Sequence, residues 1–270
     1  MKTNTMMRVA SVLLVAVLLS TCAIAGTYAK YVTSASGTDT ARVAKWGIRM
    51  DNTGKSTFVA QYDSTNPTVK GLNGSTEADV VAPGTNSSAT YKVTGTPETD
   101  YVVTFEGKDI TDVYLKAGAY TYTTNASGND ASYTTPVTTT VNSDYYPITY
   151  TITISSAIGE IGNVENASST IIADAQKTTD ESTQKITYKA TYTKLSDALA
   201  DLAKVKVTYS NNEMCDLEVV LSWEWKFNNE NDLNDTILGD LAAGSIVSGT
   251  NDSYSLNIKY TLTLTATQID

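Results

Sequence analysis

Two long stretches near the end of the chain alternate between apolar and polar residues, and this alternation constrains the fold more than any other feature. Residues 217–227 carry apolar side chains at Leu217, Val219, Leu221, Trp223, Trp225 and Phe227. Residues 254–264 carry them at Tyr254, Leu256, Ile258, Tyr260, Leu262 and Leu264. A period of two places such side chains on one face of a β-strand, whereas a helix repeats every ~3.6 residues. We therefore expect two long strands, adjacent to each other in the centre of a sheet.

Shorter stretches with the same alternation predict the remaining strands, for a total of about ten. They lie at residues 40–50, 57–62, 89–93, 101–105, 146–154, 186–192 and 205–209. Pro83 and Gly84 predict a type II turn before the strand at 89–93. This strand and the one at 101–105 are expected to form a hairpin. Short strands in this number predict an all-β fold, an antiparallel β-sandwich.

One segment repeats with the spacing of a helix. The i, i+3, i+4, i+7 pattern of an amphipathic helix is met by Leu195, Ala198, Leu199 and Leu202. Thr193 stands where a helix N-cap is expected. We predict one short crossover helix here, which covers an edge of the sandwich.

The beginning of the chain has the layout of an export signal: two basic residues and then an apolar run over residues 9–25. This run is short for a membrane span, which needs about 20 apolar residues. Small residues allow cleavage after Ala29 or, as the alternative, after Ala25. Left uncleaved, the run would be an anchor helix and the protein's one contact with a membrane. Cys22 offers a third reading, a lipoprotein signal.

The charged and reactive residues exclude several classes of function. The formal net charge is −10, which repels nucleic acid and anionic membrane surfaces. The chain contains no histidine, so Ser-His-Asp, Cys-His and histidine-ligated zinc chemistry are excluded. Outside the signal only Cys215 remains, and we predict a small, half-buried residue rather than a link between molecules. We expect no enzymatic activity.

An acidic stretch and an aromatic set are the two candidate binding sites. Residues 228–235 are rich in oxygen ligands, and Glu230, Asp232 and Asp235 are candidates for calcium. The stretch lacks the glycine and final glutamate of an EF-hand, and a solvated acidic hairpin loop is the preferred interpretation. The aromatic set consists of Trp223, Trp225, Tyr254 and Tyr260. These side chains could line a sugar-binding face, but their period of two favours the core.

Several segments resemble the TasA/camelysin family, secreted matrix proteins of Gram-positive bacteria that a SipW-type signal peptidase releases. The resemblance lies in residues 26–31 (GTYAKY), 33–40, 41–47 (ARVAKWG), 82–97 and 263–270, and in the loop after 223–227. It implies cleavage after Ala29 and a jelly roll. Periodicity alone would not distinguish a jelly roll from an immunoglobulin-like sandwich.

Together these features predict a signal peptide over residues 1–29 and a single β-sandwich domain over residues 30–270. The expected role is a secreted structural protein of the biofilm matrix or cell surface of a Gram-positive bacterium. Cleavage would free a flexible segment, residues 30–40, that adds as a strand to the sheet edge of the next subunit. The residues that begin this segment are Lys30, Tyr31, Val32 and Thr33.

Self-association and the signal peptidase are therefore the expected partners, with no cofactor beyond the calcium candidates. One alternative is a monomeric surface adhesin or carbohydrate-binding module. Another is an exported peptidase, because camelysin-like proteins have been described as peptidases. No H-E-x-x-H motif supports the peptidase reading.

Overall fold

The computed structural model describes residues 7, 9–16, 45–52, 81–124, 135–227, 231–242, 246–249 and 254–269. The chain divides into two compact units, Met1–Val43 and Ala44–Asp270. Met7 and residues 9–16 of the first unit are helical. Within these described ranges, no helix combines the length and apolar character that crossing a membrane requires.

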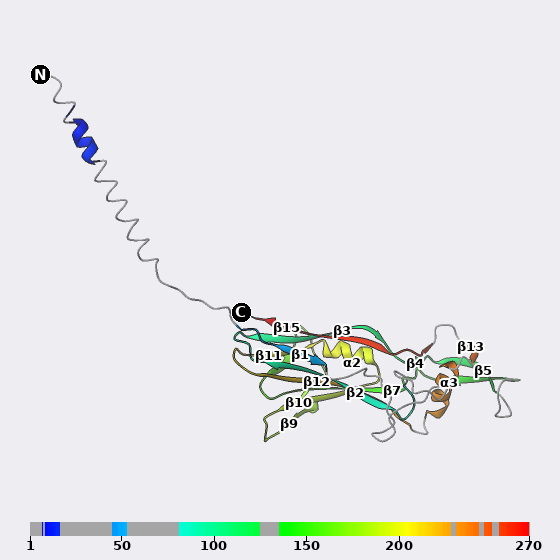
Figure 1. Ribbon diagram of the computed structural model, residues 1–270. Helices are drawn as coiled ribbons and strands as arrows, with labels where there is room; N and C mark the ends of the chain where they lie inside the picture. The colour runs from blue at the N-terminus through cyan, green and yellow to red at the C-terminus, as the bar shows by residue number, and fades with distance from the viewer. Residues whose placement is uncertain are drawn as a thin grey trace. The chain divides into compact units, whose positions relative to one another are not determined.

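The second unit is built from antiparallel sheets that pack against each other (Figure 1). The order in the six-stranded sheet is β1 (Arg49–Asn52), β2 (Asn86–Gly95), β12 (Cys215–Trp225), β7 (Ile148–Ser156), β10 (Ile186–Tyr192) and β9 (Lys177–Thr179). The order in the four-stranded sheet is β15 (Lys259–Gln268), β3 (Tyr101–Thr111), β11 (Val205–Tyr209) and β8 (Glu160–Asn163). Every neighbouring pair is antiparallel. The predicted antiparallel β-sandwich is confirmed.

The strand order is that of a jelly roll with one strand displaced. The strands β2, β3 and β7 to β12 can be counted from first to eighth. In the larger sheet, β2, β12, β7 and β10 are then the first, eighth, third and sixth strands. In the smaller sheet, β3, β11 and β8 are the second, seventh and fourth. The fifth strand, β9, pairs with β10 in the larger sheet. Apart from β9 and β10, consecutive strands in this count alternate between the sheets, so most contacts in the fold join residues that are distant in sequence.

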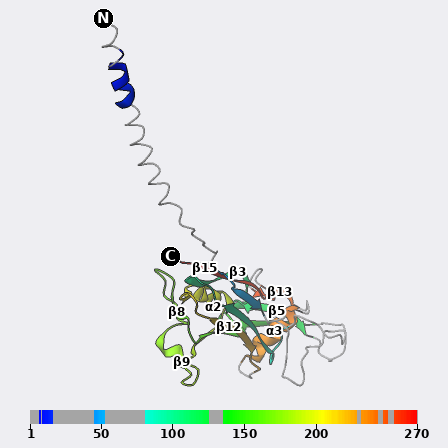
Figure 2. The same cartoon turned by 60° about the vertical axis from the view of Figure 1, so that its left-hand side comes forward.

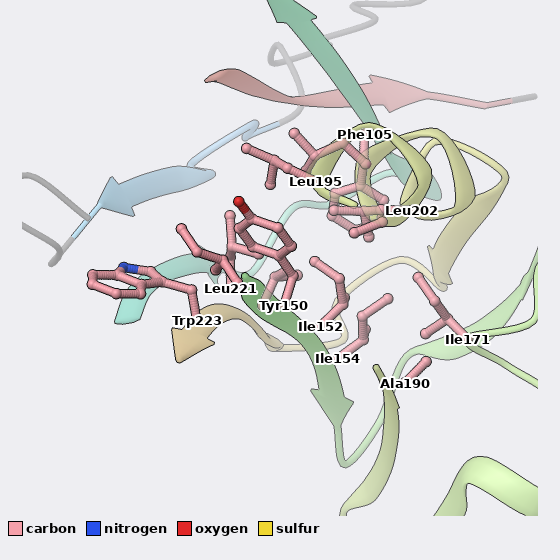
Figure 3. Close-up of a cluster of buried hydrophobic side chains, with 14 of the residues drawn as sticks. Phe105, Tyr150, Ile152, Ile154, Ile171, Ala190, Leu195, Leu202, Leu221 and Trp223 are labelled. Atoms are coloured by element: carbon pink, nitrogen blue, oxygen red, sulfur yellow. The ribbon is translucent and has the colours of Figure 1, made fainter. Parts of the chain in front are cut away.

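The core forms where the inward faces of the two sheets meet. Along β12 the residues from Cys215 to Trp225 alternate between buried and half-buried or exposed, as the sequence predicts. Ile152 and Ile154 of β7 are buried, as are Val103 of β3 and Val207 of β11. Each such side chain contributes about 1.5–3 kcal/mol by leaving water. Figure 3 shows Ile152 and Ile154 in one cluster with Leu221, Tyr150 and Phe105.

The predicted helix is confirmed as α2 (Leu195–Leu202), with its four apolar residues buried. It connects β10 to β11 and contacts β3, β7 and β10, so it packs between the sheets rather than over an edge (Figure 2). The predicted cap at Thr193 is wrong, because the N-cap is Lys194 and makes no side-chain cap bond. The carboxylate of Asp112 instead accepts the backbone N–H of Leu195 at 2.7 Å and that of Ser196 at 3.3 Å. The cap thus comes from a residue distant in sequence.

The predicted hairpin of residues 89–93 and 101–105 is wrong, although both strands exist. β2 pairs with β1 and β12, whereas β3 pairs with β11 and β15. The segment between them passes from one sheet to the other. Alternation shows which face of a strand is buried but not which strand lies beside it. The type II turn before β2 is confirmed by a φ of 84° at Gly84 and a 3.0 Å bond from Thr85 N to Ala82 O.

The two long strands at the end of the chain are not neighbours. β12 lies inside the larger sheet, as predicted, but between β2 and β7. The second stretch is divided into β14 (Tyr254–Ser255) and β15, which lies at the end of the smaller sheet. Phe227 lies beyond β12 and is 74% exposed, so its predicted burial is wrong.

The predicted strand at residues 40–50 is also largely wrong in its described part. Residues 45–48 are not in a strand, and β1 begins at Arg49. Trp46 is 40% and Met50 46% exposed, so neither belongs to a buried face. β1 is the last strand of its sheet, with a neighbour on one side only. The predicted strand at 57–62 lies outside the described residues.

The remaining elements, except η1 (Asp174–Gln176) beside β10, gather at one end of the sandwich (Figures 1 and 2). β5 (Gly118–Thr124), β6 (Thr135–Val141) and β13 (Ile246–Gly249) form a three-stranded sheet, and β4 (Tyr114–Leu115) pairs with β14. The helices outside the core are η1 and α3 (Asp232–Ala242). The described residues hold fifteen strands, more than predicted, because several have only two to four residues.

Candidate functional site

The residues that the sequence assigns to export and assembly lie outside the described part of the chain. They are the cleavage positions Ala25 and Ala29 and the assembly residues Lys30, Tyr31, Val32 and Thr33. The structure therefore describes the surface that would receive the N-terminal segment, but not the segment. An acceptor for an added strand would be an exposed edge of one of the two large sheets.

Four strands end the two large sheets in the described part of the chain, and β15 differs from the other three. β1 and β8 have four residues each and β9 has three, whereas β15 has ten. Short edge strands present few unpaired backbone groups, and charge or proline along an edge discourages pairing with other chains. β15 contains one charged residue, Lys259, and no proline. It is therefore the least protected of these edges.

The backbone of β15 is regular over most of its length. It pairs with β3 without interruption from Thr261 opposite Lys108 to Gln268 opposite Tyr101, and the register shifts only between Lys259 and Thr261. In a regular edge strand about half of the backbone N–H and C=O groups point away from the neighbouring strand. Beyond the bulge, β15 thus offers a continuous template for an added antiparallel or parallel strand.

Apolar side chains beside this edge are incompletely covered. The inward side chains of β15 are half-buried against the core, namely Tyr260, Leu262, Leu264 and Ala266. A 2.8 Å hydrogen bond between the hydroxyl groups of Tyr260 and Tyr91 joins β15 of the smaller sheet to β2 of the larger sheet. We call these half-buried side chains of β15 the seam. The seam is apolar surface that a further strand can bury.

The acidic stretch does not form the predicted hairpin loop. Asp232 begins α3, and Asp235 lies in its first turn. Its Oδ1 atom accepts hydrogen bonds from the Tyr145 hydroxyl at 2.6 Å and from Trp225 Nε1 at 3.1 Å. Burial raises the pKa of the Asp235 carboxyl above its ordinary value, against the effect of these two donors. Asp235 therefore fastens α3 to the end of β12.

The apolar residues that pack α3 against the core come after the acidic stretch, so the acidic stretch alone does not predict a helix. They are Ile237, Leu238 and Leu241, all buried. Of the calcium candidates, Glu230 lies outside the described residues. In the described part of the chain, no three acidic, cysteine or histidine side chains are grouped so that they could hold a metal ion.

The aromatic set is split by the structure. Trp223 is 2% exposed and Trp225 is also buried, which confirms the core interpretation for both. Tyr254 is exposed, and Tyr260 makes the cross-sheet contact with Tyr91. These four side chains do not share a face, so they do not form the sugar platform considered from the sequence.

Cys215 is fully rather than half buried, with 1% of its surface exposed. Burial raises the pKa of its thiol above the ordinary value, although the backbone N–H of Leu217 and the nearby hydroxyl of Tyr209 act in the opposite direction. The rings of Tyr209 and Tyr101 stack with centroids 5.0 Å apart. A thiol enclosed in this way cannot reach a second molecule, so the alternative of an intermolecular disulfide is wrong for the folded protein.

Asp201 is a buried carboxylate that sequence reasoning missed. Its oxygens accept bonds from Thr170 N–H and Oγ1, Ile171 N–H, the Tyr192 hydroxyl and Lys204 Nζ, at 2.6–3.3 Å. Burial opposes ionisation, but the hydrogen bonds from Thr170, Tyr192 and Lys204 outweigh it and hold the pKa at about 2. The partners lie on three segments, so no local pattern could identify this site. It fastens the loop before η1 to α2 and is structural.

The candidate functional site is therefore the backbone edge of β15 together with the seam. In Figures 1 and 2 this strand runs along the margin of the sandwich, next to β3. The arrangement can bind an extended peptide through main-chain hydrogen bonds and can bury its alternate side chains. Comparison of the chain with protein-family models, with curated proteins and with solved structures finds no match.

Proposed function

We propose that the protein is a secreted structural component of the cell surface or biofilm matrix, and that its subunits join by addition of a β-strand. The acceptor is the β15 edge of one subunit, and the donor is the segment Lys30–Thr40 of the next. The observation that carries the proposal is the ten-residue length of β15 at the end of its sheet, with Lys259 as its one charge.

The proposed donor has the length of a matching strand, and its first residues favour strand formation. Eleven residues from Lys30 to Thr40 span about 36 Å when extended, and the ten residues of β15 span about 33 Å. Tyr31, Val32 and Thr33 are β-branched or aromatic and favour a strand. Cleavage after Ala29 would place them at the free end of the chain, where they can reach another molecule.

Burial of the seam supplies the driving force in this proposal. Ordering a donor residue costs about 1–2 kcal/mol, and a backbone hydrogen bond returns only about 0.5–1.5 kcal/mol net. Main-chain pairing alone therefore at best offsets its own cost. Covering half-exposed Leu262 and Leu264 with an apolar donor side chain tips the balance toward association.

Edge-blocking variants test this mechanism. In protein cleaved after Ala29, Thr265→Lys places a charge on the exposed face of the acceptor strand. Thr208→Lys is the matched control, because Thr208 shares the outer face of the same sheet but lies on the internal strand β11. Filaments are counted by negative-stain electron microscopy over a concentration series.

Filaments in the wild type and in Thr208→Lys, with few in Thr265→Lys, are the expected result. Deletion of residues 30–40 should abolish them as well. Wild-type protein that stays monomeric at every concentration, or filaments that survive the deletion unchanged, would refute the proposal.

A further inference from the structure

A polar hollow lies on the outer face of the six-stranded sheet, away from the smaller sheet that carries β15. Its volume is about 500 Å³, which is within the usual range for small-molecule sites. The side chains that line it come from β2, β12, β7 and β10, and they include hydroxyl, amide, carboxylate and ammonium groups. Apart from Trp223, none of these side chains belongs to the candidate sites described above.

The register of the sheet sets these groups in two rows. Ser88 of β2 lies opposite Ser222 of β12, which lies opposite Thr151 of β7. In the next row, Asn86 lies opposite Glu224, and Glu224 opposite Thr149. Two strand spacings make each row about 10 Å wide. The hollow exists because the first row has only short side chains.

Much of the hydrogen-bonding capacity around the hollow is unused by the protein. Within the described ranges, the side chains of Asn86, Ser88, Thr149, Lys189 and Glu224 make no hydrogen bond or ion pair with another protein group. The contacts of the remaining hydroxyls are long, at 3.3 Å from Thr151 Oγ1 to Thr191 Oγ1 and 3.4 Å from Ser222 Oγ to Thr151 O. A bound molecule can therefore satisfy these groups without breaking strong internal bonds.

The mixture of groups selects the class of ligand. Hydroxyl and amide groups both donate and accept, Glu224 only accepts and Lys189 only donates. One carboxylate and one ammonium balance in charge, and the chain's net charge of −10 disfavours an anion. An apolar ligand would leave the polar lining unsatisfied.

We propose that this hollow binds a neutral oligosaccharide, which presents hydroxyl groups that match both rows. Trp223 lies at the hollow but is almost entirely buried, so it cannot serve as a stacking platform. Binding then depends on hydrogen bonds, and the affinity is modest. This proposal is independent of assembly, since it concerns the other sheet.

Saturation-transfer NMR on the exported chain tests the site. The probes are chitotriose, cellotriose, maltotriose, mannotriose and galactotriose, with trigalacturonate as the anionic comparison. Ser222→Leu fills the hollow from a position on the solvent side of the sheet. Thr208→Leu makes a similar change on the outer face of the smaller sheet and is the control. Glu224→Gln removes the charge but keeps the shape.

The expected result is saturable binding of at least one neutral trisaccharide, retained in Thr208→Leu and lost in Ser222→Leu. Glu224→Gln should weaken it about tenfold, the usual effect of losing a hydrogen bond to a charged group. Binding of none of the neutral probes, binding of trigalacturonate alone, or binding unaffected by a correctly folded Ser222→Leu variant would overturn the proposal. Correct folding is checked by an unchanged unfolding temperature.

Discussion

Replacing Asp201 by Asn should remove the stability that depends on its negative charge. The pKa of this carboxyl is held at about 2, against an ordinary value of 3.8. This gap corresponds to about 2.4 kcal/mol of stability at neutral pH. Asn keeps an oxygen that can accept from Thr170, Ile171 and Tyr192, so Asp201→Asn isolates the charge. Asp201→Ala also leaves these buried donors unpaired and should cost more, about 3–5 kcal/mol.

The pH dependence gives the sharper test. Because the pKa of Asp201 is lower in the folded state, its contribution is complete above the unfolded pKa and is lost as pH falls from about 4 to about 2. Urea unfolding of the exported chain should thus give a wild-type advantage over Asp201→Asn that is constant at pH 5–7 and shrinks below pH 4. The control is Asp174→Asn, an exposed position in η1, with an expected change within ~0.5 kcal/mol.

A loss below about 1 kcal/mol in Asp201→Asn at pH 7 would refute this account of the carboxylate. A loss that stays the same down to pH 2 would refute it as well, since it would show that the charge is not responsible. Equal m-values in both proteins are required for either comparison.

Three further predictions concern single side chains. Asp112→Ala should cost about 0.5–2 kcal/mol in urea unfolding and Asp112→Asn much less, because Asn can still cap α2; equal losses would contradict the capping role. Since the folded pKa of Asp235 is raised, its ionisation destabilises the fold as pH rises, so Asp235→Asn should unfold at a higher temperature than wild type at pH 7 but not at pH 3. A variant less stable at both pH values would contradict this. Cys215 should not react with a thiol reagent such as DTNB in the native protein but should react fully in urea, and rapid native labelling would contradict its burial.

Local periodicity predicted the elements that bury one face. β7, β12 and α2 were all expected within a few residues of their observed bounds, because each carries a clear apolar repeat. Pro83 and Gly84 predicted their turn for an equally local reason, the φ angles that these residues favour.

Sheet membership was not predictable in the same way. β2 and β3 alternate as the two strands of a hairpin would, yet they belong to opposite sheets. The alternation reports that one face of each strand is buried against the facing sheet. It does not report which strand lies beside it. The edge position of β15 was hidden because it repeats the pattern of the internal strand β12. The Asp112 cap and the rows beside Ser222 depend on pairings between distant segments. Such contacts exist only once the topology is set.

The central claim is that β15 of one subunit receives the N-terminal segment of another, and disulfide trapping tests it most directly. One protein carries Val32→Cys or Thr33→Cys, two neighbouring positions that would face opposite sides of the donor strand. The other carries Thr265→Cys on β15 or, as the control, Thr208→Cys on internal β11. Because each protein has only one of the two new cysteines, a mixed disulfide can form only between molecules. Mass spectrometry of the oxidised mixtures identifies the linked peptides.

The account predicts a mixed dimer that links residue 32 or 33 to position 265, with little product at position 208. No mixed dimer from either donor position, or equal yields at 265 and 208, would contradict strand addition at β15.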